Sequence, residues 1–464
     1  MQKPMFVQLI KPEFEELISN KDWVALKEVL NDVPAADISD LLLELPSDIA
    51  VVIFRLLKKP VAADVFAELP STKGVELLEL FSKQQLSDVM GNLEPDEQVS
   101  ILEELPGHLT QRVMNSIKPD EQKQLKKMLG YPEESVGRLM TPRYVKVKSH
   151  WTIARSMEHI RKYGETAETI NVIYVVDDNE HLIDDLRITH LILADQDDKI
   201  ESLMDRSFEA LSVYDDQEEA VKMLAKYDRV ALPAVDTDGV LVGIVTADDV
   251  IDVAEEETTE DMQKMAGMDA LDDYYSQSSI FSIVKKRLWW LIILFVGQIL
   301  TAIAMEGYED ILQKVVALSF FVPLIISSGG NSGAQAATLV IRALATDDLK
   351  PEDWKKVFTR EFSSGLMLGA LIGLLGFVTL VGWDLLAGEV LSAAVFLTAG
   401  VIGLSLFSIV LFGNFTGAML PFVLSKLDLD PAVSSAPFVA TIVDVSGIII
   451  YFTIAILLLS GTLL

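Results

Sequence analysis

A single carboxylate in an otherwise uncharged segment is the residue of this sequence from which we first expect chemistry. Asp444 lies near the middle of residues 431–464, which hold no other charged side chain. With a rise of about 1.5 Å per residue, a helix over this segment can cross a hydrocarbon layer of about 30 Å. A carboxylate at that depth costs several kcal/mol unless it faces water, a partner or an ion. We therefore expect Asp444 to face a cation path.

A stretch of small and polar residues is a second candidate for lining an ion path. Residues 327–335 read Ser-Ser-Gly-Gly-Asn-Ser-Gly-Ala-Gln and follow Pro323. This composition predicts a broken or closely packed helix, whose freed carbonyls would need a buried or watery environment. Such carbonyls, with Asn331 and Gln335, could line a cation path. The alternative is a helix–helix contact made by small residues. Residues 413–417, followed by Pro421, are a further candidate for a polar kink.

An acidic run precedes the first apolar interval. Residues 248–261 contain eight acidic side chains and no basic one. On a helix, Asp249, Asp252, Glu256 and Glu260 share one face, where like charges repel. A divalent cation would convert that repulsion into attraction, which makes the run a candidate cation sensor. The alternative is an ordinary solvated linker.

The available donor groups favour a hard cation. The chain has no cysteine, which excludes disulfides and thiolate metal sites. A site tuned for Zn²⁺ or Cu²⁺ is not expected, whereas Mg²⁺ keeps several waters and takes one or two carboxylates per site. All the histidines precede the apolar intervals, and we interpret them as surface or structural residues: His108, His150, His159, His181 and His190.

Charge divides the chain into two parts. Of its 464 residues 23% are charged, and the formal net charge is -31. The charges crowd residues 1–287, and five long uncharged intervals follow. This pattern predicts an acidic soluble part fused to a membrane part, and such acidity disfavours nucleic acid as a partner while attracting cations. The alternative is that acidity serves solubility. Acidic residues interrupt the N-terminal stretch, so we do not expect a signal peptide there.

The first block, residues 1–130, is predicted to be helical and repetitive. Similar motifs start at Asp40, Asp64 and Asp88, spaced 24 residues apart, and a weaker copy starts at Arg112. Units of this size cannot bury their apolar faces singly, so they should stack into a small superhelix. The repeating acids are either a solvated face or, with Asp88 best placed, cation contacts.

The second block, residues 131–253, alternates strands and helices in two copies. We expect a helix over Ile153–Tyr163 and a strand over Val172–Val176 in the first copy, with matching elements at 217–226 and Ala231–Val235 in the second. The pattern resembles a tandem pair of CBS modules. Thr246 and Asp249 could hold the ribose of a nucleotide such as ATP; the alternative is a rigid dimerisation platform.

The uncharged intervals predict five membrane spans, at 288–305, 315–341, 362–383, 390–425 and within 431–464. Basic residues lie at 285–287 and in the loop after the second span, and acidic residues lie in the opposite loops. This distribution predicts a cytoplasmic N-terminus and a C-terminus outside. Asp430 then lies at the cytoplasmic mouth.

Four motifs make the resemblance specific. Residues 321–335, 341–345, 417–422 and 437–444 resemble the MgtE family of magnesium channels, as does the order of parts. The resemblance implies a multidomain membrane protein with an all-α superhelical N domain (1–130), an α/β tandem CBS pair (131–253), an acidic plug or connecting helix (254–285) and a five-helix transmembrane domain (286–464). It also implies a homodimer in the plasma membrane, with one pore formed by two subunits.

The same resemblance implies roles for individual residues. Asp444 would hold a hydrated Mg²⁺ on the pore axis, and Asp430 would lie at the inner entrance. Cytosolic Mg²⁺ would close the pore by bridging sensor acids at Asp88, Glu218, Asp228, Asp249, Asp252, Glu257, Glu260 and Asp261. The pore-lining residues would be Asn331, Gln335, Ala440 and Asp444. Two positions depart from the family pattern, because Ala436 and Gln84 stand where the family can carry Asn and an acid.

Two other functions were weighed against a Mg²⁺ uptake channel. A secondary carrier for another divalent cation, such as Co²⁺ or Mn²⁺, would be expected to show a relay of ionisable groups, whereas the spans hold only Asp444. An intramembrane aspartyl hydrolase needs two acids at one site; one subunit supplies one, and a dimer could bring two together. The predicted spans contain no nucleophile–base pair either. We therefore expect a channel rather than an enzyme.

Overall fold

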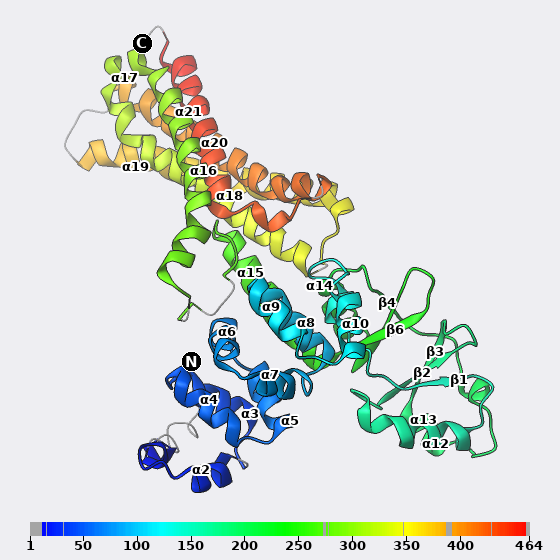
Figure 1. The fold of residues 1–464 in the computed structure, drawn as a ribbon. Helices are drawn as coiled ribbons and strands as arrows, with labels where there is room; N and C mark the ends of the chain where they lie inside the picture. The colour runs from blue at the N-terminus through cyan, green and yellow to red at the C-terminus, as the bar shows by residue number, and fades with distance from the viewer. Residues whose placement is uncertain are drawn as a thin grey trace. The chain divides into compact units, whose positions relative to one another are not determined.

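The computed structural model describes residues 12–14, 16–30, 32–271, 275–276, 278–346, 348–386, 392–427 and 429–460. The chain divides into two compact units, Met1–Glu257 and Thr258–Leu464. Figure 1 shows the ribbon of both units, coloured from the N-terminus to the C-terminus.

The N-terminal helices stack as the sequence repeat predicts. The motifs that start at Asp40, Asp64 and Asp88 lie on α3, α5 and α7, and α3 contacts α5, which contacts α7, which contacts α9. Prolines precede or open most of the other helices, where a missing N–H is harmless. The bounds are α2 Trp23–Leu30, α3 Ala35–Leu43, α4 Ser47–Leu56, α5 Lys59–Ala67, α6 Ser71–Leu80, α7 Lys83–Met90, α8 Pro95–Glu104, α9 Gly107–Met114, α10 Pro119–Met128 and α11 Val136–Leu139.

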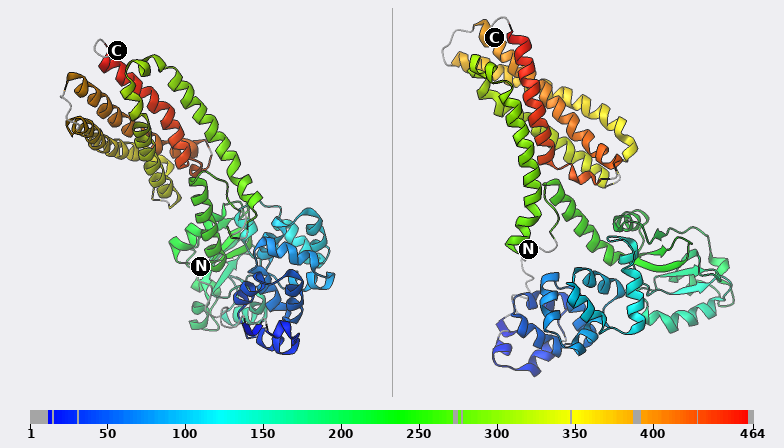
Figure 2. Two further views of the ribbon diagram at one scale, coloured as in Figure 1. Left: turned by 90° about the vertical axis from the view of Figure 1, so that its left-hand side faces the viewer. Right: turned by 45° about the horizontal axis from the view of Figure 1, so that its top comes forward.

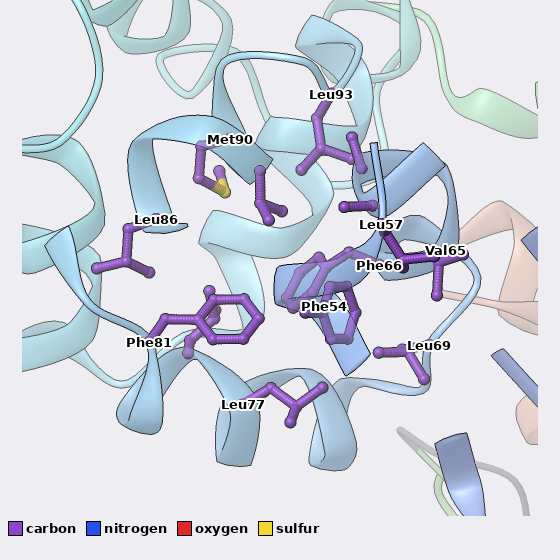
Figure 3. Close-up of a cluster of buried hydrophobic side chains, with 14 of the residues drawn as sticks. Phe54, Leu57, Val65, Phe66, Leu69, Leu77, Phe81, Leu86, Met90 and Leu93 are labelled. Atoms are coloured by element: carbon purple, nitrogen blue, oxygen red, sulfur yellow. The ribbon is translucent and has the colours of Figure 1, made fainter. Parts of the chain in front are cut away.

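Aromatic side chains form the centre of this helical stack. The rings of Phe54, Phe66 and Phe81 come from three successive helical segments and meet with centroids 5.3–6.2 Å apart (Figure 3). All three rings are buried, and burial of this kind stabilises stacked units that could not fold singly. Arg112 donates to the carbonyls of Leu78, Glu79 and Phe81, so it satisfies carbonyls at the end of α6.

The next part of this unit holds two matching three-stranded sheets. In each, the first strand pairs parallel with the second, and the second pairs antiparallel with the third. The register shifts at Val175/Val176 in one sheet and at Ala234/Val235 in the other, which shows how closely the two copies correspond. The bounds are β1 Lys146–Lys148, α12 Ile153–Tyr163, η1 Gly164–Thr166, β2 Val172–Val176, β3 Leu182–Arg187, α13 Ile188–Leu193, η2 Ile200–Leu203, β4 Leu211–Ser212, α14 Gln217–Tyr227, β5 Ala231–Val235 and β6 Leu241–Thr246.

The acidic run is helical. Helix α15, Ala247–Met265, follows directly on β6 and contains all of the predicted sensor acids from Asp249 to Asp261. Asp249, Asp252, Glu256 and Glu260 therefore do share a helical face.

Among its described residues, the second unit contains five helices that are long and apolar enough to cross a membrane. Helix α20 packs against α18, α19 and α21, and α16 packs against α21 (Figure 2). Several of these helices extend beyond the uncharged intervals. Charged and aromatic side chains are tolerated at such helix ends, because the ends reach the membrane–water interface. The bounds are α16 Ile280–Glu306, α17 Glu309–Lys314, η3 Val316–Phe321, α18 Val322–Ala345, η4 Pro351–Asp353, α19 Trp354–Leu386, α20 Ala393–Lys426, η5 Pro431–Val433 and α21 Ala436–Leu459.

Small residues bring α18 and α20 into backbone contact. A Cβ added at Gly413 would lie 2.3 Å from the carbonyl oxygen of Gly329, and one at Gly417 would lie 2.0 Å from that of Gly333. Of the two structures that the small residues favoured, the closely packed helix is confirmed. The broken helix is wrong, because α18 is continuous through its glycines and Pro323 lies in its first turn, where proline is tolerated.

Candidate ion path and cation-binding acids

The surroundings of Asp444 combine one amide and a close backbone. Gln298 of α16 donates through Nε2 to Asp444 Oδ2 at 2.8 Å. On the other side, a Cβ added at Gly330 of α18 would lie 4.0 Å from Asp444 Oδ1 and 3.4 Å from the Cβ of Ala440. Asp444 itself is half-buried. Three helices thus meet at one carboxylate, which keeps an oxygen available for water or an ion.

Gln298 is a functional candidate that the sequence reasoning missed. The sequence did contain a signal for it, because Gln298 is the one amide side chain within the first apolar interval, residues 288–305. Nothing in the sequence, however, pairs position 298 with position 444, because the pairing depends on how α16 packs against α21.

The other predicted pore-lining residues lie near Asp444 to different degrees. Ala440 is one helical turn before Asp444 and faces Gly330. Asn331 and Gln335 are exposed on α18, and Asn331 Nδ2 donates to Ser327 Oγ at 3.4 Å. Their assignment to the pore stays a prediction, because Gly330 rather than either amide is the α18 residue seen beside Asp444.

Asp430, the predicted mouth residue, is bound to a lysine. Its Oδ1 accepts from the backbone N–H of Ala432 at 2.8 Å, which caps η5. Its Oδ2 accepts from Nζ of Lys264 at 2.8 Å, and the same ammonium also pairs with Glu260. Two predicted metal-binding acids therefore share one cationic partner within the second unit.

Several predicted sensor acids of the first unit also have partners. Asp88 accepts from Lys59 at 2.8 Å and from Gln84 at 2.9 Å, and the bond from Lys59 is the main reason why its pKa is lowered. Glu218 pairs with Lys222, and Glu257 accepts from Gln217 at 2.7 Å.

Two further sensor candidates have distinct surroundings. Asp228 ends α14 in the left-handed conformation with φ of 49°, which Asp tolerates better than most residues. Burial, and then repulsion from Glu255 and Asp248, raises the pKa of Asp252.

The predicted nucleotide-binding pair is engaged with itself. Thr246 Oγ1 donates to Asp249 Oδ2 at 2.6 Å, and Thr246 is buried. A ribose would have to replace this bond in order to use both groups.

A cluster of acids around Asp249 is the main feature that sequence reasoning missed. Burial is the largest cause of the raised pKa of Asp96, and the charge of Asp249 adds to it. Burial also raises the pKa of Glu97 to about 7, and a hydrogen bond with Glu94 raises the pKa of Glu168. These acids come from the start of α8, the loop after η1 and α15, so only the packing of the first unit brings them together. We call Glu94, Asp96, Glu97, Glu168 and Asp249 the α8 acid cluster.

The carboxylates of the α8 acid cluster repel one another when they are ionised. Burial raises the pKa of Asp96, Glu97 and Asp249, and a hydrogen bond with Glu94, followed by burial, raises the pKa of Glu168, because ionisation is penalised there. Within the described part of the chain, no three Asp, Glu or His side chains are close enough to hold one metal ion together. A cation would therefore need a rearrangement of side chains or bridging water.

Comparisons with known proteins agree with this architecture. A family model described as the MgtE intracellular N domain matches residues 33–134, CBS models match 136–197 and 200–256, and the MgtE divalent cation transporter model matches 322–454. The magnesium transporter MgtE of Thermus thermophilus is 42% identical over 338 residues, which are 73% of this chain and 73% of that protein. That of Bacillus subtilis is 33% identical over 335 residues, 72% of this chain and 71% of that protein.

Solved structures cover the cytosolic part of the similarity. The cytosolic domain of the Mg²⁺ channel MgtE in complex with ATP matches with a TM-score of 0.50 and 33% identity, covering 52% of this chain and 98% of that one. The soluble part of a magnesium transporter matches with a TM-score of 0.50 at 24% identity, covering 54% of this chain and 99% of that one, and it shows the fold alone.

Proposed function

Because the chain belongs to the MgtE family of magnesium transporters and is a multi-pass membrane protein, we propose that it is a Mg²⁺-selective channel for magnesium uptake across the plasma membrane. The observation that carries this proposal is Asp444, the one carboxylate within the five long apolar intervals of the sequence, held by Gln298 beside Gly330. A half-buried carboxylate beside an amide suits Mg²⁺, which dehydrates reluctantly and binds through few carboxylates.

The pore is proposed to form between two subunits. One subunit contributes one carboxylate at this depth, and two related carboxylates would attract a divalent cation more strongly than one. Helix α16 has none of its most apolar window buried within the chain, which is consistent with lipid or a second subunit covering it. The N-terminus is proposed to be cytoplasmic and the C-terminus extracytoplasmic. A membrane potential negative inside then favours entry by about 2.3 kcal/mol per charge per 100 mV.

Closure is proposed to follow from Mg²⁺ binding to the acids of the cytosolic part. The α8 acid cluster joins an N-domain helix to α15, so neutralising it would favour the compact arrangement of the first unit. The remaining proposed sensor acids are Asp88, Glu218, Asp228, Asp252, Glu257, Glu260 and Asp261. A relative's cytosolic domain was crystallised with ATP, and on that basis ATP is proposed as a ligand of the CBS pair here, with Thr246 and Asp249 as candidate contacts.

The test is patch recording from the full chain with Mg²⁺ varied on the cytoplasmic side. Asp444→Asn should remove most of the Mg²⁺ current, because the amide carries no net negative charge and attracts a divalent cation much less strongly than a carboxylate does. Asp384→Asn, which removes an acid at the far end of α19, is the matched control and should conduct normally. Unaltered current in Asp444→Asn would exclude this residue from the ion path. Equal currents carried by Co²⁺ or Mn²⁺, with proton coupling, would favour the alternative of a secondary carrier.

A further inference from the structure

Lys264 connects the end of the acidic helix to the residue proposed as the inner mouth of the pore. Its Nζ lies 2.8 Å from Asp430 Oδ2, although 166 residues separate the two positions in sequence. The same Nζ contacts Glu260, one turn earlier on α15. One ammonium thus links two carboxylates that carry the same charge and would otherwise repel each other.

The contact is supported by packing around it. Met265, the next residue, packs against the buried cluster of the second unit that includes Ala432 and Val439. Gly267 has a φ of +76°, and a Cβ there would lie 3.4 Å from Ser435 Oγ and from Pro437 Cγ. The chain leaving α15 therefore lies directly on the start of α21, the helix that carries Asp444.

We propose that Lys264 is a positioning residue that acts as a built-in cation, holding the end of α15 at Asp430. The inference rests on the proposed channel function. One ammonium offsets the repulsion between Glu260 and Asp430, two acids that are both proposed to bind Mg²⁺. The same positive charge beside Asp430 also reduces the attraction of the mouth for a passing cation, so the contact favours a non-conducting state.

Inside-out patches of the full chain test this directly, with Mg²⁺ in the pipette and a chelator on the cytoplasmic side. Lys264→Met keeps the apolar stem and removes the charge, and it should raise the open probability on the order of fivefold, the effect of losing one modest ionic contact. Lys264→Arg should behave as the wild type. Lys426→Met removes a lysine exposed at the end of α20 and should also leave the open probability unchanged.

Coupling to Asp430 separates this role from a general structural one. Asp430→Asn should raise the open probability to a similar extent, and the double variant with Lys264→Met should add nothing further. An unchanged open probability in Lys264→Met would overturn the inference, as would a wild-type channel already fully open without Mg²⁺.

A second measurement does not depend on conduction. The chain has no cysteine, so Met265→Cys introduces one thiol beside Lys264. In chelator, a maleimide should label this thiol several-fold faster when Lys264→Met is added, because the α15 end is released from α21. Equal labelling rates would overturn the inference. The absence of a Mg²⁺ current would instead refute the proposed function, and the labelling rates would still test the inference in that case.

Discussion

Replacing Glu97 with glutamine should remove a large part of the pH dependence of stability in the first unit, Met1–Glu257. Glu97 has its pKa raised from 4.5 to about 7, chiefly by burial and then by the charges of Glu94, Asp64 and Asp249. The folded state holds this proton more tightly than the unfolded state. Between pH 4.5 and about 7, the unfolded chain therefore binds fewer protons than the folded chain. Stability therefore falls as pH rises from about 4.5 to about 7 and changes little beyond.

The magnitude follows from the size of the shift. At about 1.4 kcal/mol per pKa unit, the decrease in the free energy of unfolding that Glu97 causes is on the order of 3 kcal/mol. Asp96 and Glu168 also have raised pKa values, so they act in the same direction. Glutamine keeps the carbonyl oxygen that Glu97 uses to accept from the backbone N–H of Glu94 at 2.7 Å. The substitution thus removes the charge and retains the helix cap.

The assay is urea unfolding of residues 1–257 at pH 5 and pH 8, with and without Mg²⁺. The cytosolic domain of a relative has been crystallised by itself, which supports studying this part alone. In the wild type, Mg²⁺ should stabilise more at pH 8, where fewer protons compete for the carboxylates. Glu97→Gln should weaken the fall in stability between pH 5 and 8, and Glu79→Gln, at an exposed position, should not. An unchanged slope in Glu97→Gln, or equal stabilisation by Mg²⁺ at both pH values, would refute the reasoning.

Two further predictions concern the helix contact and the sensor. Gly417→Ala should lower the melting temperature in detergent, because its Cβ would lie 2.0 Å from the carbonyl oxygen of Gly333 and overpacking costs about 1–3 kcal/mol. Gly400→Ala is the control, since no atom lies within 4 Å of its added Cβ. Equal melting temperatures of the two variants would contradict the close contact. A triple variant that neutralises three proposed sensor acids, Glu257→Gln, Glu260→Gln and Asp261→Asn, should stay open in patches at high cytoplasmic Mg²⁺. The reason is that it lacks acids proposed to bind the closing ion. Normal closure of this variant would exclude the three acids as sensors.

Local elements were predictable because their signals are local. Helix α12 and strands β2 and β5 begin and end where alternation and helical periodicity place them. The five apolar intervals became five apolar helices, since backbone groups in hydrocarbon must bond within the segment. The glycines of residues 327–335 left two structures open, and only the fit of α18 against α20 shows that they serve close packing.

The sequence by itself determined the fold class, the repeats and the five spans, because composition and periodicity act over neighbouring residues, and it identified Asp444 as a candidate site residue. It could not pair Gln298 with Asp444, Lys264 with Asp430, or Glu94 with Glu168. These contacts join positions on different helices and loops, and each depends on the rotation and register with which those elements pack. The tertiary structure alone decided which charges are neighbours. It thereby turned an acidic composition into a defined acid cluster and a lysine held at the proposed mouth of the pore.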